Sequence, residues 1–398
     1  MSQYSSPHLN LEWKHYAGFF LVSILLFCFS YYLNETNEYG RDYSFSALAG
    51  GALGFLMQRS RFCFFCNFKD FLIKKESSGL LGILTAIAIS TLGYSVVFGA
   101  WIPDPNASYL PPNAFIAPVH IHLLLGGLAF GFGMSLSGSC ISGHLYRIGE
   151  GSFSSWFAII GSGVGFILGF VSWNFIFIHW VSEADIIWLP KYLGYGLSTF
   201  IILGILFVLA VWISKKGKQP YDTFPSSPDF PKNIIEGRWP SWIGGIGVGI
   251  LSFVYYLRVR PIGVTSELGR LSRELGNLLG IIPTRLEGLD TISGCITSAD
   301  GAKFFTINAV FVLSLVLGSF GSALGSKQFS VSLGENPTFK AGISFFGGIF
   351  LGWGAMVSIG CTFGTFFSGI SAHSLSGFVF AIGLIPGILA GLVLLKIK

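Results

Sequence analysis

Long apolar runs separated by short polar stretches dominate this chain. Two shorter runs, 45–58 and 241–257, are rich in glycine and end at basic residues. The pieces 62–73 and 140–146 are too short to cross a bilayer, and such pieces persist at membrane depth only when protein buries them or they line a cavity. Other runs approach the roughly 20 residues that a spanning helix needs, and these are 16–33, 78–100, 121–138, 153–180, 192–213, 304–325, 341–360 and 377–396. The pattern predicts an all-α polytopic membrane protein with about nine spanning helices and short half-helices.

The composition narrows the class of protein. Of 398 residues, 52% are apolar and only 11% are charged, whereas a soluble domain carries about 25% charged residues. These values exclude a disordered chain, a disulfide-rich secreted scaffold and an ordinary cytosolic enzyme. The apolar runs are continuous rather than alternating, which argues against a β-barrel. The net charge of +5 comes from residues between the runs, a distribution that suits lipid headgroups better than nucleic acid.

The distribution of basic residues predicts the topology. Segment 214–239 holds five Lys or Arg residues and four prolines, whereas loop 103–119 holds no basic residue. The positive-inside rule therefore places 214–239 in the cytoplasm as a linker and 103–119 outside. No small-residue cleavage site follows the first apolar run, so we expect a retained helix there.

An internal repeat divides the rest of the chain. GGLAFGFGMSLSGSC at 126–140 matches GGIFLGWGAMVSIGC at 347–361 without a gap. A weaker similarity relates 51–63 to 245–266. We therefore predict two pseudo-symmetric halves, 45–213 and 240–398, preceded by an extra N-terminal helix and loop at 1–44. Repeated halves with broken helices are typical of transporters.

Both copies of the repeat end at a cysteine. Cys140 and Cys361 each stop an apolar run, and a glycine, Gly143 or Gly364, follows three residues on. Glycines four apart also serve close helix packing alone, but a terminal cysteine favours a helix break with the thiol at the start of a short helix. Free amide N–H groups and the positive helix end then point to the same place as the thiol. A neutral S–H can hold a soft, sulfur-bearing anion without a charge that would trap it.

A third element, QRSRFCFFCNFKD at 58–70, contains a C-x-x-C pair. It is open to two readings, a basic cytoplasmic edge or a redox pair at Cys63 and Cys66. A zinc site would need two more ligands nearby, and neither His144 nor His373 has the spacing, so we expect no metal. Cys295 has no evident mate in the sequence.

Two charges, Arg147 and Glu150, follow the Cys140 piece. An ion pair between them inside the membrane would make them functional candidates. A simple role at a helix end is the alternative.

Four segments together resemble the signatures of the YeeE/YedE sulfur-transport family. They are QRSRFC at 58–63, GFGMSLSGSCISGHLYRIGEG at 131–151, PIGVTS at 261–266 and GAMVSIGCTFGTFFSGISAHS at 354–374. They cover the chain from about 50 to 380, in the order of the YeeE branch. The sequence departs from the family pattern at two positions after the first cysteine. Lys69 stands before Asp70, where arginine is usual, and Cys66 stands where a small residue is usual.

The resemblance implies a thiosulfate uptake protein of the bacterial inner membrane with an hourglass-like shape. Three thiols would line the path and relay the anion by S–H···S contacts. On matching positions these are Cys63, Cys140 and Cys361. Further candidate substrate contacts are Arg61, Gly143, Thr265, Ser266 and Gly364. A small TusA-like sulfur-carrier protein is the partner that the resemblance implies.

Three hypotheses follow. The first is uptake of thiosulfate for sulfur assimilation, the second is transport of another soft sulfur or selenium anion, and the third is a membrane thiol sulfurtransferase that uses Cys63 and Cys66, with Arg61 and Lys69 nearby. The chain contains no G-x-x-x-x-G-K-[ST] motif, so ATP-driven pumping by this chain alone is not expected. We expect a transporter rather than an enzyme, without a cofactor.

Overall fold

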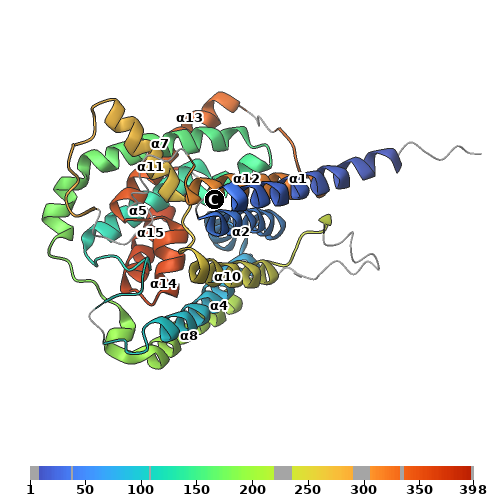
Figure 1. Ribbon diagram of the computed structural model, residues 1–398. Helices are drawn as coiled ribbons and strands as arrows, with labels where there is room; N and C mark the ends of the chain where they lie inside the picture. The colour runs from blue at the N-terminus through green and yellow to red at the C-terminus, as the bar shows by residue number, and fades with distance from the viewer. Residues whose placement is uncertain are drawn as a thin grey trace, which may run out of the picture.

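The computed structural model consists of helices packed around a buried centre (Figure 1). It describes residues 9–36, 39–106, 109–218, 235–289, 305–331 and 336–395. Within these ranges there is no β-strand, and the β contacts there are isolated bridges. Cys295 and most of the predicted linker, residues 219–234, lie outside the described residues.

The helices of the N-terminal part are α1 (Leu9–Thr36), α2 (Gly40–Ser60), α3 (Phe64–Lys74), α4 (Ser78–Trp101), α5 (Ile121–Ser137), α6 (Ile141–Gly149), α7 (Phe153–Ile176), the π-helical turn η1 (Phe177–Val181) and α8 (Leu189–Lys216). The helices of the C-terminal part are α10 (Ser241–Arg258), α11 (Thr265–Leu278), α12 (Ile307–Gly325), α13 (Pro337–Val357), the π-helical segment η3 (Thr362–Ser368), α14 (Gly369–Ser371) and α15 (Leu375–Leu394).

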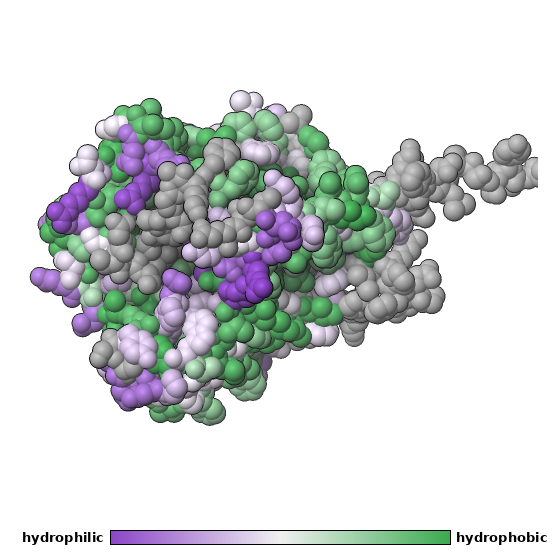
Figure 2. Space-filling view, viewed as in Figure 1, coloured by the Kyte–Doolittle hydropathy of each residue, from purple (hydrophilic) through white to green (hydrophobic). Residues whose placement is uncertain are grey.

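Eight helical stretches in the described part of the chain are long and apolar enough to cross a membrane. This confirms the prediction of an all-α, multi-pass membrane protein, with eight such stretches where the pattern predicted about nine. Helices α2 and α10 are 21 and 18 residues long but are not among the eight, because glycine, serine and charged positions lower their mean hydropathy. Large apolar side chains such as Phe207 and Val208 of α8 stand exposed. Figure 2 shows apolar side chains spread over the visible face, as a lipid-facing surface requires.

Helix pairs approach so closely that a side chain would not fit at some contacts. A Cβ at Gly54 of α2 would lie 1.9 Å from the carbonyl oxygen of Leu315 in α12. A Cβ at Gly131 of α5 would lie 2.2 Å from the carbonyl oxygen of Leu384 in α15. Glycine therefore allows backbone-to-backbone packing, which is the main source of helix association in a bilayer.

The helix pairings follow a pattern. Helix α12 packs on α2 and α10 packs on α4, while α13 packs on α7 and α15 packs on α5. Exchanging α2 with α10, α4 with α12, α5 with α13 and α7 with α15 converts each of these pairs into another of them, and leaves the contact between α5 and α13 unchanged. A two-fold relation between halves would produce this arrangement, although the repeat itself stays a prediction. Helix α1 lies outside this scheme and packs on α2 and α12 (Figure 1).

Candidate functional site

The four sequence signatures coincide with four breaks between helices. The breaks separate α2 from α3, α5 from α6, α10 from α11, and α13 from η3. At three of them the backbone turns through a left-handed residue, namely Arg61 (φ 48°), Gly138 (φ 85°) and Ile359 (φ 59°). A β-branched isoleucine pays a steric cost in that conformation, so the packing around Ile359 must hold the turn in place. Each break leaves the free N–H groups of a new helix end inside the protein.

Cysteines cap three of the four new helices. Cys63 precedes α3, Cys140 precedes α6 and Cys361 precedes η3, all with extended backbones. The Sγ atom of Cys63 accepts a hydrogen bond from the backbone N–H of Cys66 at 3.4 Å. The Sγ atom of Cys140 accepts the equivalent bond from Gly143, also at 3.4 Å. These thiols therefore occupy the position that Ser or Asp takes at an ordinary N-cap.

Cys63 and Cys140 lie close together, although they cap different helices. The Sγ atom of Cys63 is 3.3 Å from the Oγ atom of Ser139, the residue before Cys140, and the Cys63 and Cys140 side chains interact. The Sγ atom of Cys140 lies 3.2 Å from the Oγ atom of Ser142. Gly143 leaves room for this contact, because a Cβ on it would lie 2.0 Å from the Ser139 hydroxyl oxygen and would force that hydroxyl to move.

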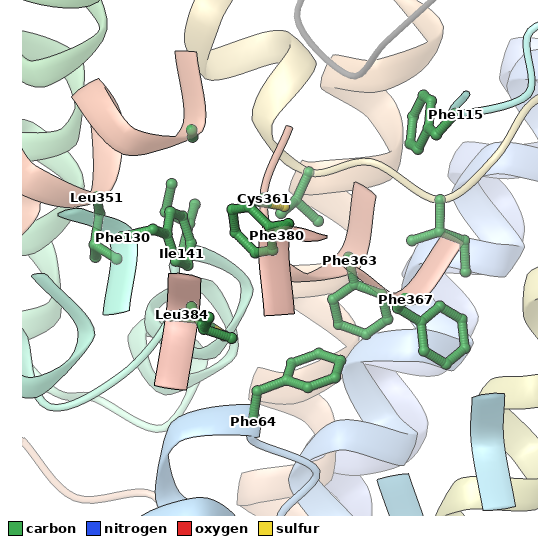
Figure 3. Close-up of a cluster of buried hydrophobic side chains, with 14 of the residues drawn as sticks. Phe64, Phe115, Phe130, Ile141, Leu351, Cys361, Phe363, Phe367, Phe380 and Leu384 are labelled. Carbon is green, nitrogen blue, oxygen red and sulfur yellow. The ribbon is translucent and has the colours of Figure 1, made fainter. Parts of the chain in front are cut away.

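Cys361, in the C-terminal part of the chain, is connected to the Cys63 break through aromatic side chains. Its side chain is buried among aromatic rings, and Figure 3 shows it beside Phe380 and near Phe363. The ring of Phe64, the residue after Cys63, lies 5.2 Å from the ring of Phe363 in an edge-to-face contact. Cys63, Cys140 and Cys361 belong to one contiguous cluster of buried side chains. We call these three residues the thiol cluster.

The remaining candidate contacts are divided between the interior and the surface. Thr265 and Ser266 are buried at the start of α11, where the Ser266 hydroxyl donates to the carbonyl oxygen of Gly263 at 3.2 Å. Gly364 is buried within η3. Arg61, by contrast, is exposed at the end of α2. The structure thus brings the third signature to the interior as well, but leaves the arginine of the first signature at the edge.

Arg147 and Glu150, the two charges for which an ion pair or a role at a helix end was open, lie at the end of α6. The guanidinium of Arg147 donates to Cys66 Sγ at 2.9 Å and to the carbonyl oxygen of Gly138 at 3.1 Å, and no ion pair joins it to Glu150 in the described part of the protein. Glu150 caps the C-terminus of α6, and its backbone oxygen accepts from Ser330. Arg147 therefore ties α6 to the C-x-x-C segment instead of pairing with its own neighbour.

Comparison with known protein families finds one whose model covers this part of the chain. The model of the Sulphur transport family matches residues 59–390, a stretch that contains all four breaks. This chain belongs to that family.

Named members of the sulfur-transport family share moderate identity with this member. It is 26% identical to "Thiosulfate transporter TsuA" of Escherichia coli (strain K12) over 80% of this chain and 84% of the relative. It is 24% identical to the protein of that name from Spirochaeta thermophila over 85% and 95%, and 28% identical to "Probable transporter YedE" of E. coli over 42% and 40%. The resemblance to the YeeE/YedE family is confirmed, and the names agree with transport rather than enzymatic function.

The sequence reasoning singled out neither Ser139, at the site, nor Arg59, a buried residue of the first signature. Ser139 joins Cys63 to the second break, but nothing in its type or spacing sets it apart from the other serines of the segment. Arg59 is almost fully buried and donates to the Gln58 side chain and to the carbonyl oxygen of Gly237. The basic run QRSR was the available signal, but such a run also fits an exposed cytoplasmic edge. Among the described residues no group of three His, Cys, Asp or Glu side chains could hold a metal ion.

Proposed function

We propose that this member of the sulfur-transport family takes up thiosulfate through a path lined by Cys63, Cys140 and Cys361. The observation that carries the proposal is that three helix starts, each capped by a cysteine, contribute to one buried cluster. Two relatives named as thiosulfate transporters match over most of their length, which supports this substrate.

The energetics explain why several weak sites in series suit this anion. Thiosulfate carries two negative charges, and burying them bare would cost tens of kcal/mol. Each hydrogen bond to a charged group returns about 1.5–3 kcal/mol, and a helix N-terminus returns up to about 2 kcal/mol. Three thiols at three helix ends supply such contributions as neutral groups. The Arg147 guanidinium, which donates to Cys66 Sγ, adds a positive charge near Cys63.

The thiols also fit the chemistry of the substrate. The terminal sulfur of thiosulfate is soft and accepts S–H···S contacts, while its oxygens accept from the backbone N–H groups of the first helical turn. Thr265 and Ser266 at the start of α11, with Gly143 and Gly364 in the capped helices, are the further contacts that we propose. We further propose that the path runs inward across the bacterial inner membrane between two pseudo-symmetric halves.

Arg61 marks the inner end of the path that we propose. Arg61 is exposed where α2 ends, and positive charge marks the cytoplasmic side. Exposed lysines, among them Lys74 and Lys75, follow at the end of α3. A TusA-like sulfur-carrier protein is the partner that we propose to receive the sulfur there. Copurification with such a carrier would test this step. The carrier should copurify with the wild type and be lost when Lys74 and Lys75 are both replaced by Glu.

The experiment that tests the function is uptake of radiolabelled thiosulfate into proteoliposomes. The variants Cys63→Ala, Cys140→Ala and Cys361→Ala should each abolish uptake. The matched control is Cys28→Ala, because Cys28 is exposed on α1 and belongs to none of the breaks. Wild-type uptake by the variants of the thiol cluster would refute the thiol path.

Two alternatives remain distinguishable by the same preparation. Competition by sulfite or a selenium oxyanion that exceeds competition by unlabelled thiosulfate would indicate another soft anion as the substrate. A persulfide on Cys63 or Cys66 after exposure to thiosulfate, detected by mass spectrometry, would indicate sulfur transfer. The transporter names of the relatives count against the latter.

A further inference from the structure

A second group of buried polar atoms lies between α4, α10 and the end of η3, the helix that begins after Cys361. Tyr94 of α4 is fully buried, and its hydroxyl forms no hydrogen bond within the described protein. The hydroxyls of Ser252 on α10 and Ser368 on η3 lie close to it, but neither meets it in hydrogen-bond geometry. A buried phenol without a partner is costly, so this atom points to a ligand.

The surrounding rings give this site rigid walls. Tyr94 stacks on Tyr256 of α10 with ring centroids 4.6 Å apart and planes inclined by 9°. The ring of Phe98 meets both tyrosines edge-on, at 5.5 and 5.8 Å. The hydroxyl of Tyr256 donates to the carbonyl oxygen of Pro112 at 2.8 Å, in the loop predicted to lie outside. The aromatic walls therefore connect the site to the outer loop.

The serines connect the same site to the centre of the protein. Ser368 is the last residue of η3, the helix that Cys361 caps. Its hydroxyl donates to the carbonyl oxygen of Ile262 at 3.5 Å, in the break that precedes α11. The hydroxyl of Ser252 accepts from Ser90 at 3.2 Å, so its own proton remains available to a ligand. The site thus stands between the outer loop and the thiol cluster.

We propose that Tyr94, Ser252 and Ser368 form an outer station that binds the sulfonate oxygens of thiosulfate before Cys361 receives the terminal sulfur. This inference rests on the proposed function. The protons of Tyr94 and Ser252 are available to two sulfonate oxygens, and Ser368 would give up its 3.5 Å contact with the Ile262 carbonyl oxygen to donate to the third. These hydroxyls are neutral, so they add no charge that would retain the anion. The aromatic walls exclude water, which strengthens each hydrogen bond to the anion.

The test compares three variants in the proteoliposome assay. Tyr94→Phe should raise the KM for thiosulfate about ten-fold or more, because it removes one hydrogen bond to a charged group, while the maximal rate changes little. Tyr255→Phe is the matched control. Tyr255, on α10, is also a buried tyrosine, but its hydroxyl already has a partner, the Ser46 hydroxyl at 3.0 Å. The KM of the Tyr255→Phe variant should therefore equal that of the wild type. The double variant Ser252→Ala with Ser368→Ala should raise the KM as Tyr94→Phe does, and it replaces that variant if the latter fails to insert.

The outcomes separate the two proposals. If the wild type takes up no thiosulfate, the proposed function fails. If the wild type takes it up, and Tyr94→Phe and the double serine variant keep the wild-type KM in a folded protein, the outer station fails and the hydroxyls serve only an ordered water. A raised KM for Tyr94→Phe with an unchanged KM for Tyr255→Phe supports the station.

Discussion

Replacing Gly143 by alanine should disturb the thiol cluster without altering any thiol. The added Cβ would lie 2.0 Å from Ser139 Oγ and 3.4 Å from Cys140 Sγ. The same Ser139 hydroxyl is 3.3 Å from Cys63 Sγ. Because the neighbouring α6 backbone cannot yield easily, the serine must rotate or shift, and its contact with Cys63 is lost.

The expected loss of stability in Gly143→Ala follows from these contacts. Overpacking a buried position costs about 1–3 kcal/mol, and the lost hydrogen bond costs roughly 1 kcal/mol more. The higher helix propensity of alanine returns up to about 1 kcal/mol. Gly143→Ala should therefore lower the stability by about 1–3 kcal/mol, seen as an earlier thermal transition in detergent. It should also reduce thiosulfate uptake, because Cys63 no longer has its partner at the second break.

A second substitution tests whether the clash with Ser139 causes the loss of stability. In the double variant Gly143→Ala with Ser139→Ala, the nearest remaining contact is the Cβ atom of residue 139 at 3.3 Å, which is tight but tolerable. The thermal transition should return toward the wild-type value, a coupling between neighbours that a double-mutant cycle measures. Uptake should stay low, since the hydroxyl is still missing. Wild-type stability and uptake in the single variant would refute the reasoning, because Ser139 would then move without cost or consequence.

Three further outcomes are expected. Gly54→Ala should lower the thermal transition, because its Cβ would overlap a backbone oxygen of α12, whereas Gly204→Ala on α8, where no atom lies within 4 Å, should leave it unchanged or raise it slightly. Diamide, a two-electron thiol oxidant, should join Cys63 to Cys66, whose sulfur atoms are 2.9 Å apart. The disulfide should stop uptake until a reductant is added. If diamide still blocked the Cys66→Ala protein, this prediction would be contradicted. Glu267→Ala should lower the thermal transition, at a cost of about 1.5–3 kcal/mol, because Arg270 of α11 keeps only the exposed carboxylate of Glu274 and Thr306 loses its acceptor. An unchanged transition would show that the pair contributes nothing.

The positions of the helix breaks could be predicted well because they depend on neighbouring residues. An apolar run that ends at a glycine or cysteine, as at Cys140 and Cys361, marks a helix end wherever the helix later packs. The structure has breaks at both positions, and helices begin directly after them. The short pieces became α3 and α6 for the same reason.

The partners of Arg147 could not be predicted. The nearest opposite charge along the chain was Glu150, and the sequence offered no sign that the guanidinium would reach Cys66, 81 residues away. Tyr94 was likewise one aromatic residue in a spanning helix until packing placed Ser252 and Ser368 near its hydroxyl.

Hydropathy and motif spacing alone therefore determined that the chain is an all-α membrane protein of the sulfur-transport family, and where its helices are interrupted. Both properties are local, since they depend on the solvent that each segment meets and on the conformations that its own residues allow. Only the tertiary structure decided that the helix starts capped by Cys63, Cys140 and Cys361 contribute to one buried cluster, and that Ser139 bridges two of them across 76 residues. Such contacts arise from the close packing of distant helices, which no single segment encodes.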